Sequence, residues 1–79
     1  MKRVSIDSTM IKSIGFEWAG HSVHGSYGTL EVEFNNGSVY QYSDVLWTHY
    51  LHVRYARHSA GRMLNALVKA NGYAFKRVA

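Results

Sequence analysis

The residues of this sequence that could do chemistry are mostly cations, and they gather in the second half of the chain. Residues 45–79 contain no carboxylate and six cationic side chains, namely Arg54, Arg57, Arg62, Lys69, Lys76 and Arg77. Residues 1–44 contain three cations and five carboxylates, so the two parts carry net charges of +6 and −2 respectively. A field of one sign attracts polyanions and speeds their arrival. The pattern predicts either contacts of these six side chains with phosphates or a solvated basic face that only maintains solubility.

Two tyrosines, Tyr40 and Tyr42, are spaced so that they share one face of a β-strand. Exposed aromatic rings are sequence-tolerant platforms for unpaired bases, worth about 1–3 kcal/mol per base. We expect Glu31 and Glu33 to lie beside these tyrosines, where their carboxylates would repel phosphates. The alternative is that a helix covers this face and that both tyrosines belong partly to the core. The tyrosines are therefore candidates for nucleic-acid binding, with a purely structural role left open.

Histidines occur in two pairs at a spacing of three residues, His21 with His24 and His49 with His52. On a helix this spacing allows two histidines to share a metal ion. Nothing in the sequence brings the pairs together, and no nearby Asp, Glu or Cys completes a ligand set. Nucleophile elbows, phosphate loops and catalytic carboxylate pairs are also missing from the sequence. We therefore expect a binding protein, not an enzyme, with no metal or other cofactor.

The chain that must position these residues has 79 residues and neither proline nor cysteine. This length is below the roughly 100–150 residues of most domains, and no linker or repeat divides it, so we expect one domain over residues 1–79. No apolar run approaches the roughly 18 residues of a membrane-spanning helix. Polar residues follow the start of the chain where a signal peptide would have an apolar stretch. We expect a soluble cytoplasmic protein without membrane contact.

Alternating apolar residues predict an antiparallel sheet. Residues 10–18 alternate as a strand, and residues 20–28 are typical of a polar loop or an extended hairpin tip. Residues 30–42 form the clearest signal, a hairpin around Asn36-Gly37, which suits a two-residue type I′ turn. That turn pairs four sets of residues: Phe34 with Val39, Glu33 with Tyr40, Val32 with Gln41, and Glu31 with Tyr42. This register predicts that Leu30, Val32, Phe34 and Val39 face the core, with both tyrosines beside the glutamates on the opposite face.

Two helices follow the hairpin. Ser43 or Asp44 can cap the first helix, which we expect to run to about Arg57. Ser59 caps the second, whose apolar stripe ends before Asn71-Gly72. Residues 73–78 are expected to form a short edge strand or an extended arm with an inward Phe75. The predicted fold is α+β, a small antiparallel sheet (the hairpin of residues 30–42 plus an N-terminal strand) packed with two C-terminal helices.

The order and spacing of these landmarks resemble the KTSC domain, a short module at the C-terminus of some lysyl-tRNA synthetases. The resemblance runs from about Ser8 to Val78. It depends on the following residues: Ile11 to Phe16, Leu30 to Phe34, Tyr40-Gln41-Tyr42, Val45, Tyr50, Ser59, Gly61, Leu64, Asn65, Tyr73, Phe75, Arg77 and Val78. The chain departs from the family pattern at Leu46, where proline is usual, and in a longer segment from His21 to Tyr27.

The resemblance implies a stand-alone domain of bacterial or phage type without synthetase activity, and RNA binding has been suggested for the family. Combined with the charge pattern, it favours binding of RNA or another polyanion through the basic C-terminal half. The alternative is a protein–protein interaction module, for instance a phage-encoded modifier of a host complex. A third possibility is self-association through a strand edge, so the chain is expected to be a monomer or a small homo-oligomer.

Overall fold

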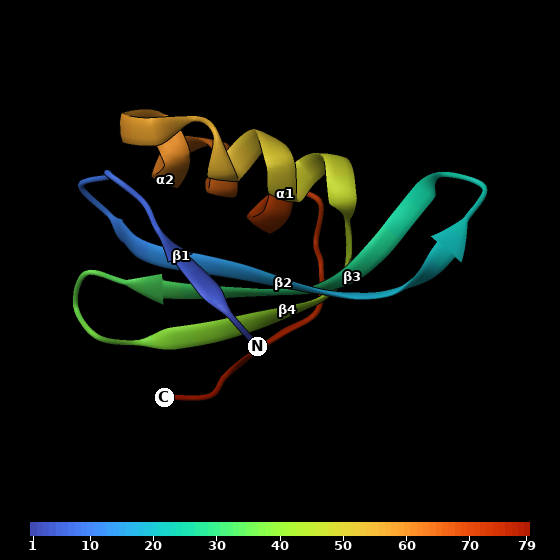
Figure 1. Cartoon of the computed structure of the whole chain (residues 1–79), viewed down its shortest axis with the longest axis horizontal. Coiled ribbons are helices and arrows are strands. Elements are labelled where there is room, and N and C mark those ends of the chain that lie inside the picture. Colours follow the sequence, from blue (N-terminus) through green and yellow to red (C-terminus); the bar gives the residue numbers. More distant parts are fainter.

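The computed structural model describes residues 1–79 as one antiparallel sheet with its helices on one face (Figure 1). The sheet has five strands in the order β1-β2-β3-β4-β5. Their bounds are β1 (Arg3–Ser5), β2 (Ile11–Ser22), β3 (Gly25–Phe34), β4 (Val39–Leu46) and β5 (Phe75–Arg77). The helical segments are α1 (Trp47–Arg54), a 3₁₀ turn η1 (Arg57–Ser59), α2 (Ala60–Leu64) and its π-helical continuation η2 (Asn65–Lys69). The predicted α+β fold with two C-terminal helices is confirmed, and β1 is an additional strand.

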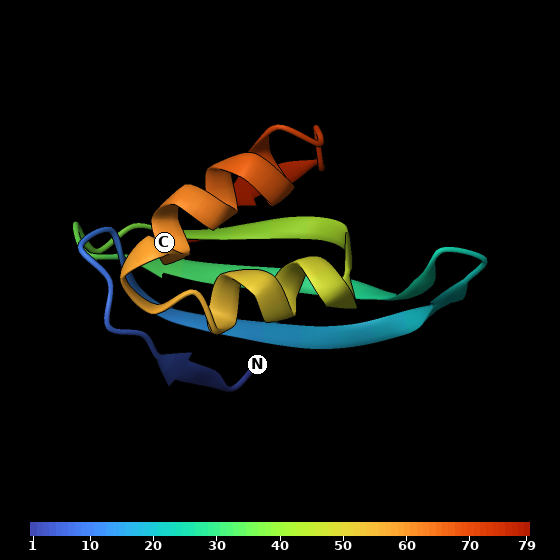
Figure 2. The ribbon, with the colours of Figure 1, turned by 90° about the horizontal axis from the view of Figure 1, so that it is seen from above.

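The core lies between the sheet and the helices. Its largest fully buried side chains come from both layers: Ile11, Ile14, Leu30, Leu64, Val32, Val45, Val53 and Val68. Seen from above (Figure 2), α1 runs over the middle of the sheet, while α2 and η2 diverge toward β4 and β5. None of the helices has the length and the apolar run that crossing a bilayer would take.

The turn between β3 and β4 differs from the predicted type I′ turn. The Phe34 N–H donates to the Ser38 carbonyl at 2.9 Å, and the Gly37 N–H donates to the Phe34 carbonyl at 2.9 Å. With Gly37 at φ 92°, these bonds close a three-residue loop in which the glycine forms a bulge. The loop is one residue longer than predicted, so the pairing of the two strands shifts by one position.

This shift changes which side chains share a face. Val32 lies opposite Tyr40, Leu30 lies opposite Tyr42, and Glu31 lies opposite Gln41. Because side chains alternate along a strand, a one-residue shift transfers a whole row to the other face. Both tyrosines therefore face the helices together with the core residues, and the prediction that they lie beside the glutamates is wrong.

The first helix begins later than predicted. Strand β4 continues through Ser43 and Asp44 to Leu46, because Val45 pairs with Gly28 and Leu46 pairs with Tyr27. Asp44 adopts a positive φ of 57° within this strand. The residue before α1 is Leu46, which provides no side-chain cap. The predicted caps at Ser43 and Asp44 are therefore wrong, since both residues lie at an irregularity within strand β4 and pairing with β3 resumes at Val45.

The second helix and the tail follow the predicted course more closely. Ser59 does precede α2, although its hydroxyl makes no capping hydrogen bond. The helix ends before Gly72, whose φ is 73° and whose N–H donates to the Lys69 carbonyl at 3.2 Å. The tail forms edge strand β5, but Phe75 is 64% exposed and does not turn inward. The predicted hairpin tip at residues 20–28 is a continuation of β2 and β3 that projects beyond the helices (Figure 1).

Candidate nucleic-acid interface

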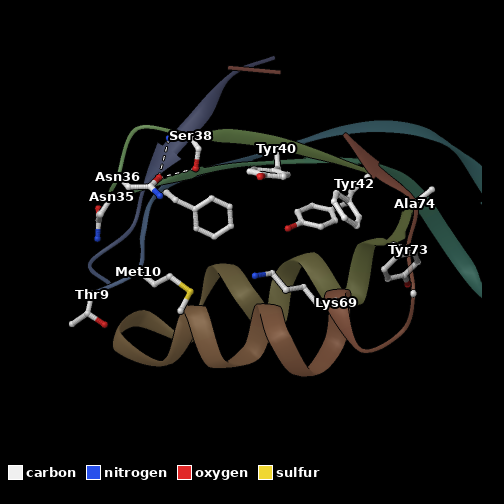
Figure 3. A pocket seen from close by; sticks show the side chains of 13 residues that line it. Thr9, Met10, Asn35, Asn36, Ser38, Tyr40, Tyr42, Lys69, Tyr73 and Ala74 are labelled. Atoms are coloured by element: carbon white, nitrogen blue, oxygen red, sulfur yellow. Dashed lines mark hydrogen bonds between the residues drawn. The ribbon is translucent and has the colours of Figure 1, made fainter. Parts of the chain in front are cut away.

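An open groove with a volume of about 1080 Å³ lies between β4–β5 and the helical segment η2 (Figure 3). We call it the aromatic groove. Its lining is dominated by five rings, those of Phe34, Tyr40, Tyr42, Tyr73 and Phe75, with Lys69 as the only charged side chain. A groove of this size is at the upper end of the roughly 300–1,000 Å³ typical of small-ligand sites.

The sheet register produces a continuous row of rings. Tyr40 and Tyr42 are two residues apart on β4, and Phe75 lies opposite Tyr42 on β5. Ring centroids are 5.8 Å apart for Phe34 and Tyr40, 6.0 Å for Tyr40 and Phe75, and 5.8 Å for Tyr42 and Phe75. These spacings are within the range of favourable aromatic pairs. Tyr42 is 3% exposed, Tyr40 is half-buried and Phe75 is exposed, so the row passes from the core to the surface.

Three polar groups inside the groove have no protein partner. The Lys69 ammonium lies 5.4 Å from the centroid of the Phe34 ring and forms no ion pair. The hydroxyls of Tyr40 and Tyr42 hydrogen-bond no other side chain or backbone group, and no polar atom is left buried without a partner, so both hydroxyls are open to the groove. Burial, with a smaller contribution from Tyr40, raises the pKa of the Tyr42 phenol above its ordinary value. At neutral pH this phenol is therefore a hydrogen-bond donor.

No carboxylate lines the aromatic groove. Glu31 and Glu33 point from the opposite face of the sheet, where Arg3 lies 3.1 Å from Glu31 and 3.9 Å from Glu33. Gln41 donates to Glu31 at 2.8 Å, and Ser13 donates to Glu33 at 2.8 Å. The carboxylates expected beside the tyrosines thus lie on the other side of the sheet, where Arg3 offsets part of their charge.

The six predicted cationic residues fall into three groups. Lys69 lines the groove, and Arg77 shares its face of the sheet because it pairs with Tyr40. Lys76 points to the opposite face, since it lies opposite Gln41. The remaining three lie on the helices away from the groove: Arg54, Arg57 and Arg62. The structure therefore brings the tyrosines together with two of the six cations.

Of the three helical cations, only Arg54 has side-chain contacts within the protein. Arg54 donates to the Tyr50 hydroxyl at 3.2 Å and lies 5.2 Å from the centroid of the Tyr55 ring. Arg57 and Arg62 are exposed, and Arg57 adopts a positive φ of 54° after the end of α1. These arginines make the electrostatic potential of the helical layer more positive. They do not line the aromatic groove that contains the tyrosines.

Sequence reasoning did not identify Phe34, Tyr73 and Phe75 as site residues. The sequence pattern predicts Phe34 in the core and Phe75 as an inward-pointing tail residue. The signal that could have found them is the loop length at Gly37: a three-residue loop places residues 34, 40 and 42 on the same face. Tyr73 depends on the path of the chain after Gly72, which local sequence does not specify.

The histidine pairs do not form a metal site. No group of three or more His, Asp or Glu side chains lies close enough to hold an ion. His49 instead bonds the Tyr73 hydroxyl through Nδ1 at 2.9 Å, and the Leu46 N–H donates to the same hydroxyl at 3.3 Å. Burial first, and then nearby His52, lowers the pKa of His49 below its ordinary value. These contacts connect the start of α1 to the segment that forms one wall of the groove.

Comparison with known proteins gives one family match. A family model described as the KTSC domain matches residues 7–73 of the chain. The matched segment includes Tyr40, Tyr42 and Lys69 and ends at Tyr73, before β5. A search of the curated proteins found no match.

Proposed function

The chain belongs to the KTSC domain family, and we propose that it is a non-catalytic domain that binds single-stranded nucleic acid, RNA in particular. Unpaired bases contact the aromatic groove, and the basic residues around it contact phosphates. Such a domain acts in the cytoplasm, where single-stranded RNA is abundant. The observation that carries this proposal is the aromatic groove itself, a row of rings with a lysine and no carboxylate.

The corrected register is what makes the groove compatible with a polyanion. Aromatic rings bind bases of any sequence, and cations supply the phosphate contacts. Glutamates beside the rings would repel the phosphates and so weaken both the stacking of bases and the phosphate contacts. Glu31 and Glu33 face the other side of the sheet beside Arg3, so a strand in the groove does not approach them.

The remaining cations provide long-range attraction. Residues 45–79 carry a net charge of +6 and form all of the helical layer and β5. A one-signed field of this kind raises the association rate of a charged partner, and salt weakens it. We therefore expect binding that decreases steeply as salt concentration rises.

Fluorescence polarisation with a labelled single-stranded RNA tests the proposal. The expected result is saturable binding at low salt, with the logarithm of the affinity falling linearly with the logarithm of salt concentration. A duplex RNA of the same sequence serves as the control and binds more weakly, because its bases are already paired and stacked. Absence of any polarisation change at low salt would reject the proposal.

A second candidate function, protein binding, is favoured by a different surface. The projecting hairpin of β2 and β3 carries Trp18, 69% exposed, and Val23, 97% exposed. Tryptophan is enriched at protein–protein interfaces, so an exposed Trp18 on a projecting arm suits a protein contact, for instance with a host complex modified by a phage protein. An affinity pull-down after nuclease treatment distinguishes the candidates: a partner that survives the nuclease and is lost in Trp18→Ser supports protein binding.

A further inference from the structure

We infer that the aromatic groove is a nucleotide-sized site that takes a nucleoside monophosphate, with the base on the exposed Phe75 ring and the phosphate on Lys69. The inference rests on the proposed function and names the chemical class of ligand for the same groove. It also separates one specific site from the general attraction that all six cations provide.

The position of Lys69 carries the phosphate contact. Figure 3 shows its side chain lying across the middle of the groove, with the ammonium and the Tyr42 hydroxyl directed toward the same end of the groove. Without a ligand, the ammonium has only the ring of Phe34, at 5.4 Å from the centroid. A cation against a ring in an open site is held weakly, whereas a charge-assisted hydrogen bond to phosphate is among the stronger polar contacts. A phosphate therefore displaces the ring as the partner of Lys69.

The tyrosine hydroxyls complete an anion site. Neither hydroxyl has a protein partner, and both open into a groove without a carboxylate. The Tyr42 phenol is protonated at neutral pH, since its ordinary pKa is 10.0 and burial raises that pKa further. One ammonium and two hydroxyls thus offer donors to the same space, and a group with several negative oxygens can accept from all of them.

The base contact comes from the exposed end of the ring row. Phe75 is 64% exposed, and its ring is inclined by 42° to Tyr42 with centroids 5.8 Å apart. A planar base can lie against the free face of Phe75 without unfolding the core. A base held in a duplex already has both faces stacked, so the site selects unpaired nucleotides.

Two asparagine amides at the other end of the groove are each held by the protein through one of their polar atoms. The Asn36 side-chain oxygen accepts from both the N–H and the hydroxyl of Ser38, at 3.0 and 2.7 Å. The Asn35 side-chain amide donates to the Ser8 carbonyl at 3.1 Å. These bonds fix the orientation of both amides, while the Asn36 side-chain NH₂ and the Asn35 side-chain oxygen form no protein hydrogen bond.

NMR titration of the ¹⁵N-labelled full chain with adenosine monophosphate tests the inference. The expected result is that millimolar nucleotide shifts the amide signals of Lys69, Tyr42 and Phe75. Adenosine and ribose 5-phosphate, which each lack half of the ligand, are expected to bind at least about tenfold more weakly, because each loses either the charged hydrogen bonds or the stacking.

Two lysine variants with equal net charge provide the matched comparison. Lys69→Met is expected to lower the affinity for adenosine monophosphate about tenfold, since it removes a charged hydrogen bond. Lys76→Met removes the same charge on the opposite face of the sheet and is expected to change the affinity by less than about twofold. Both lysines are exposed, and signal dispersion in the spectra checks that each variant remains folded.

Two outcomes would overturn the inference: equal losses in the two lysine variants, or shifts confined to the region of Arg57 and Arg62. In either case RNA binding by polarisation would leave the proposed function standing. Conversely, nucleotide binding at Lys69 without any RNA binding would reject the proposed function and leave a small-molecule site.

Discussion

Tyr42 lies directly opposite Leu30 in the sheet, which places its ring on the face that the helices cover. The neighbouring Glu31 lies opposite Gln41 and points to the other face. This single pairing separates the aromatic row from the carboxylates, and it depends on the three-residue loop at Gly37. The loop at Gly37 therefore determines that the groove is lined by aromatic rings and not by carboxylates.

The loop conformation should make Gly37 sensitive to substitution. Gly37 has a φ of 92°, where a Cβ is disfavoured although no atom lies within 4 Å of its position. Gly37→Ala is expected to lower the free energy of unfolding by about 1–2 kcal/mol, measured by urea denaturation at unchanged slope. Gly37→Asn should lose less, because asparagine tolerates positive φ. Equal losses for both variants would contradict the proposed cause.

Arg57 is an arginine in a conformation that favours glycine. Its φ is 54°, and its side chain is exposed. Arg57→Gly is expected to raise the free energy of unfolding by about 0.5–1 kcal/mol, because relief of the left-handed strain exceeds the added backbone entropy of glycine. Arg57→Ala keeps the strain and serves as the control. Thermal or urea unfolding measures both, and a loss of stability in Arg57→Gly would show that the side chain has a structural role.

Stability should decrease on acidification through His49. The folded state lowers the pKa of His49 below its ordinary value of 6.5, so below that pH the unfolded chain binds the proton more readily. Protonation therefore favours unfolding, and this contribution to stability is present above pH 6.5 and is lost as the pH falls. Urea unfolding between about pH 7.5 and about pH 5 measures the loss.

The matched variants for this pH effect are His49→Gln and His24→Gln. The first should flatten the pH dependence, because the titrating partner of Tyr73 is gone. The second changes an exposed histidine in the hairpin turn and should leave the dependence as in the original chain. An unchanged slope in His49→Gln would assign the effect to another group.

Two exposed aromatic residues distinguish the groove from the projecting hairpin. Phe75 is 64% exposed in the aromatic groove, and Trp18 is 69% exposed on the hairpin. Phe75→Ser is expected to weaken binding of single-stranded RNA by about 1–3 kcal/mol, the value of one stacked base, while Trp18→Ser leaves it unchanged. Polarisation titrations measure both affinities. The reverse pattern would move the RNA-binding surface to the hairpin.

The elements of this fold could be predicted from sequence, but the register of the hairpin could not. Asn36-Gly37 suits both a two-residue turn and a type I turn with a glycine bulge, since both place Gly37 at positive φ. The strand after the turn is apolar at neighbouring positions, Val39 and Tyr40, so alternation does not choose between the registers. Packing of the helices against Tyr40 and Tyr42 selects the observed register. This packing is a tertiary interaction, which the local sequence of the hairpin does not specify.

The start of the first helix shows the same limit. Ser43 and Asp44 have the side chains of helix caps, but Asp also tolerates the positive φ that it adopts within β4. Pairing of Val45 and Leu46 with β3 extends the strand past both candidates. The charge asymmetry, in contrast, was visible in the sequence, although only the structure shows that Lys69 and Arg77 accompany the tyrosines.

Photocrosslinking tests the central claim, that RNA contacts the aromatic groove, most directly. Single-stranded RNA containing 4-thiouridine is irradiated with the chain, and the crosslinked peptides are identified by mass spectrometry. The account predicts crosslinks on the segments that form the groove, those containing Tyr40 and Tyr42 or Tyr73 and Phe75. Crosslinks confined to the segment of Arg54, Arg57 and Arg62, with the groove segments unmodified, would contradict it.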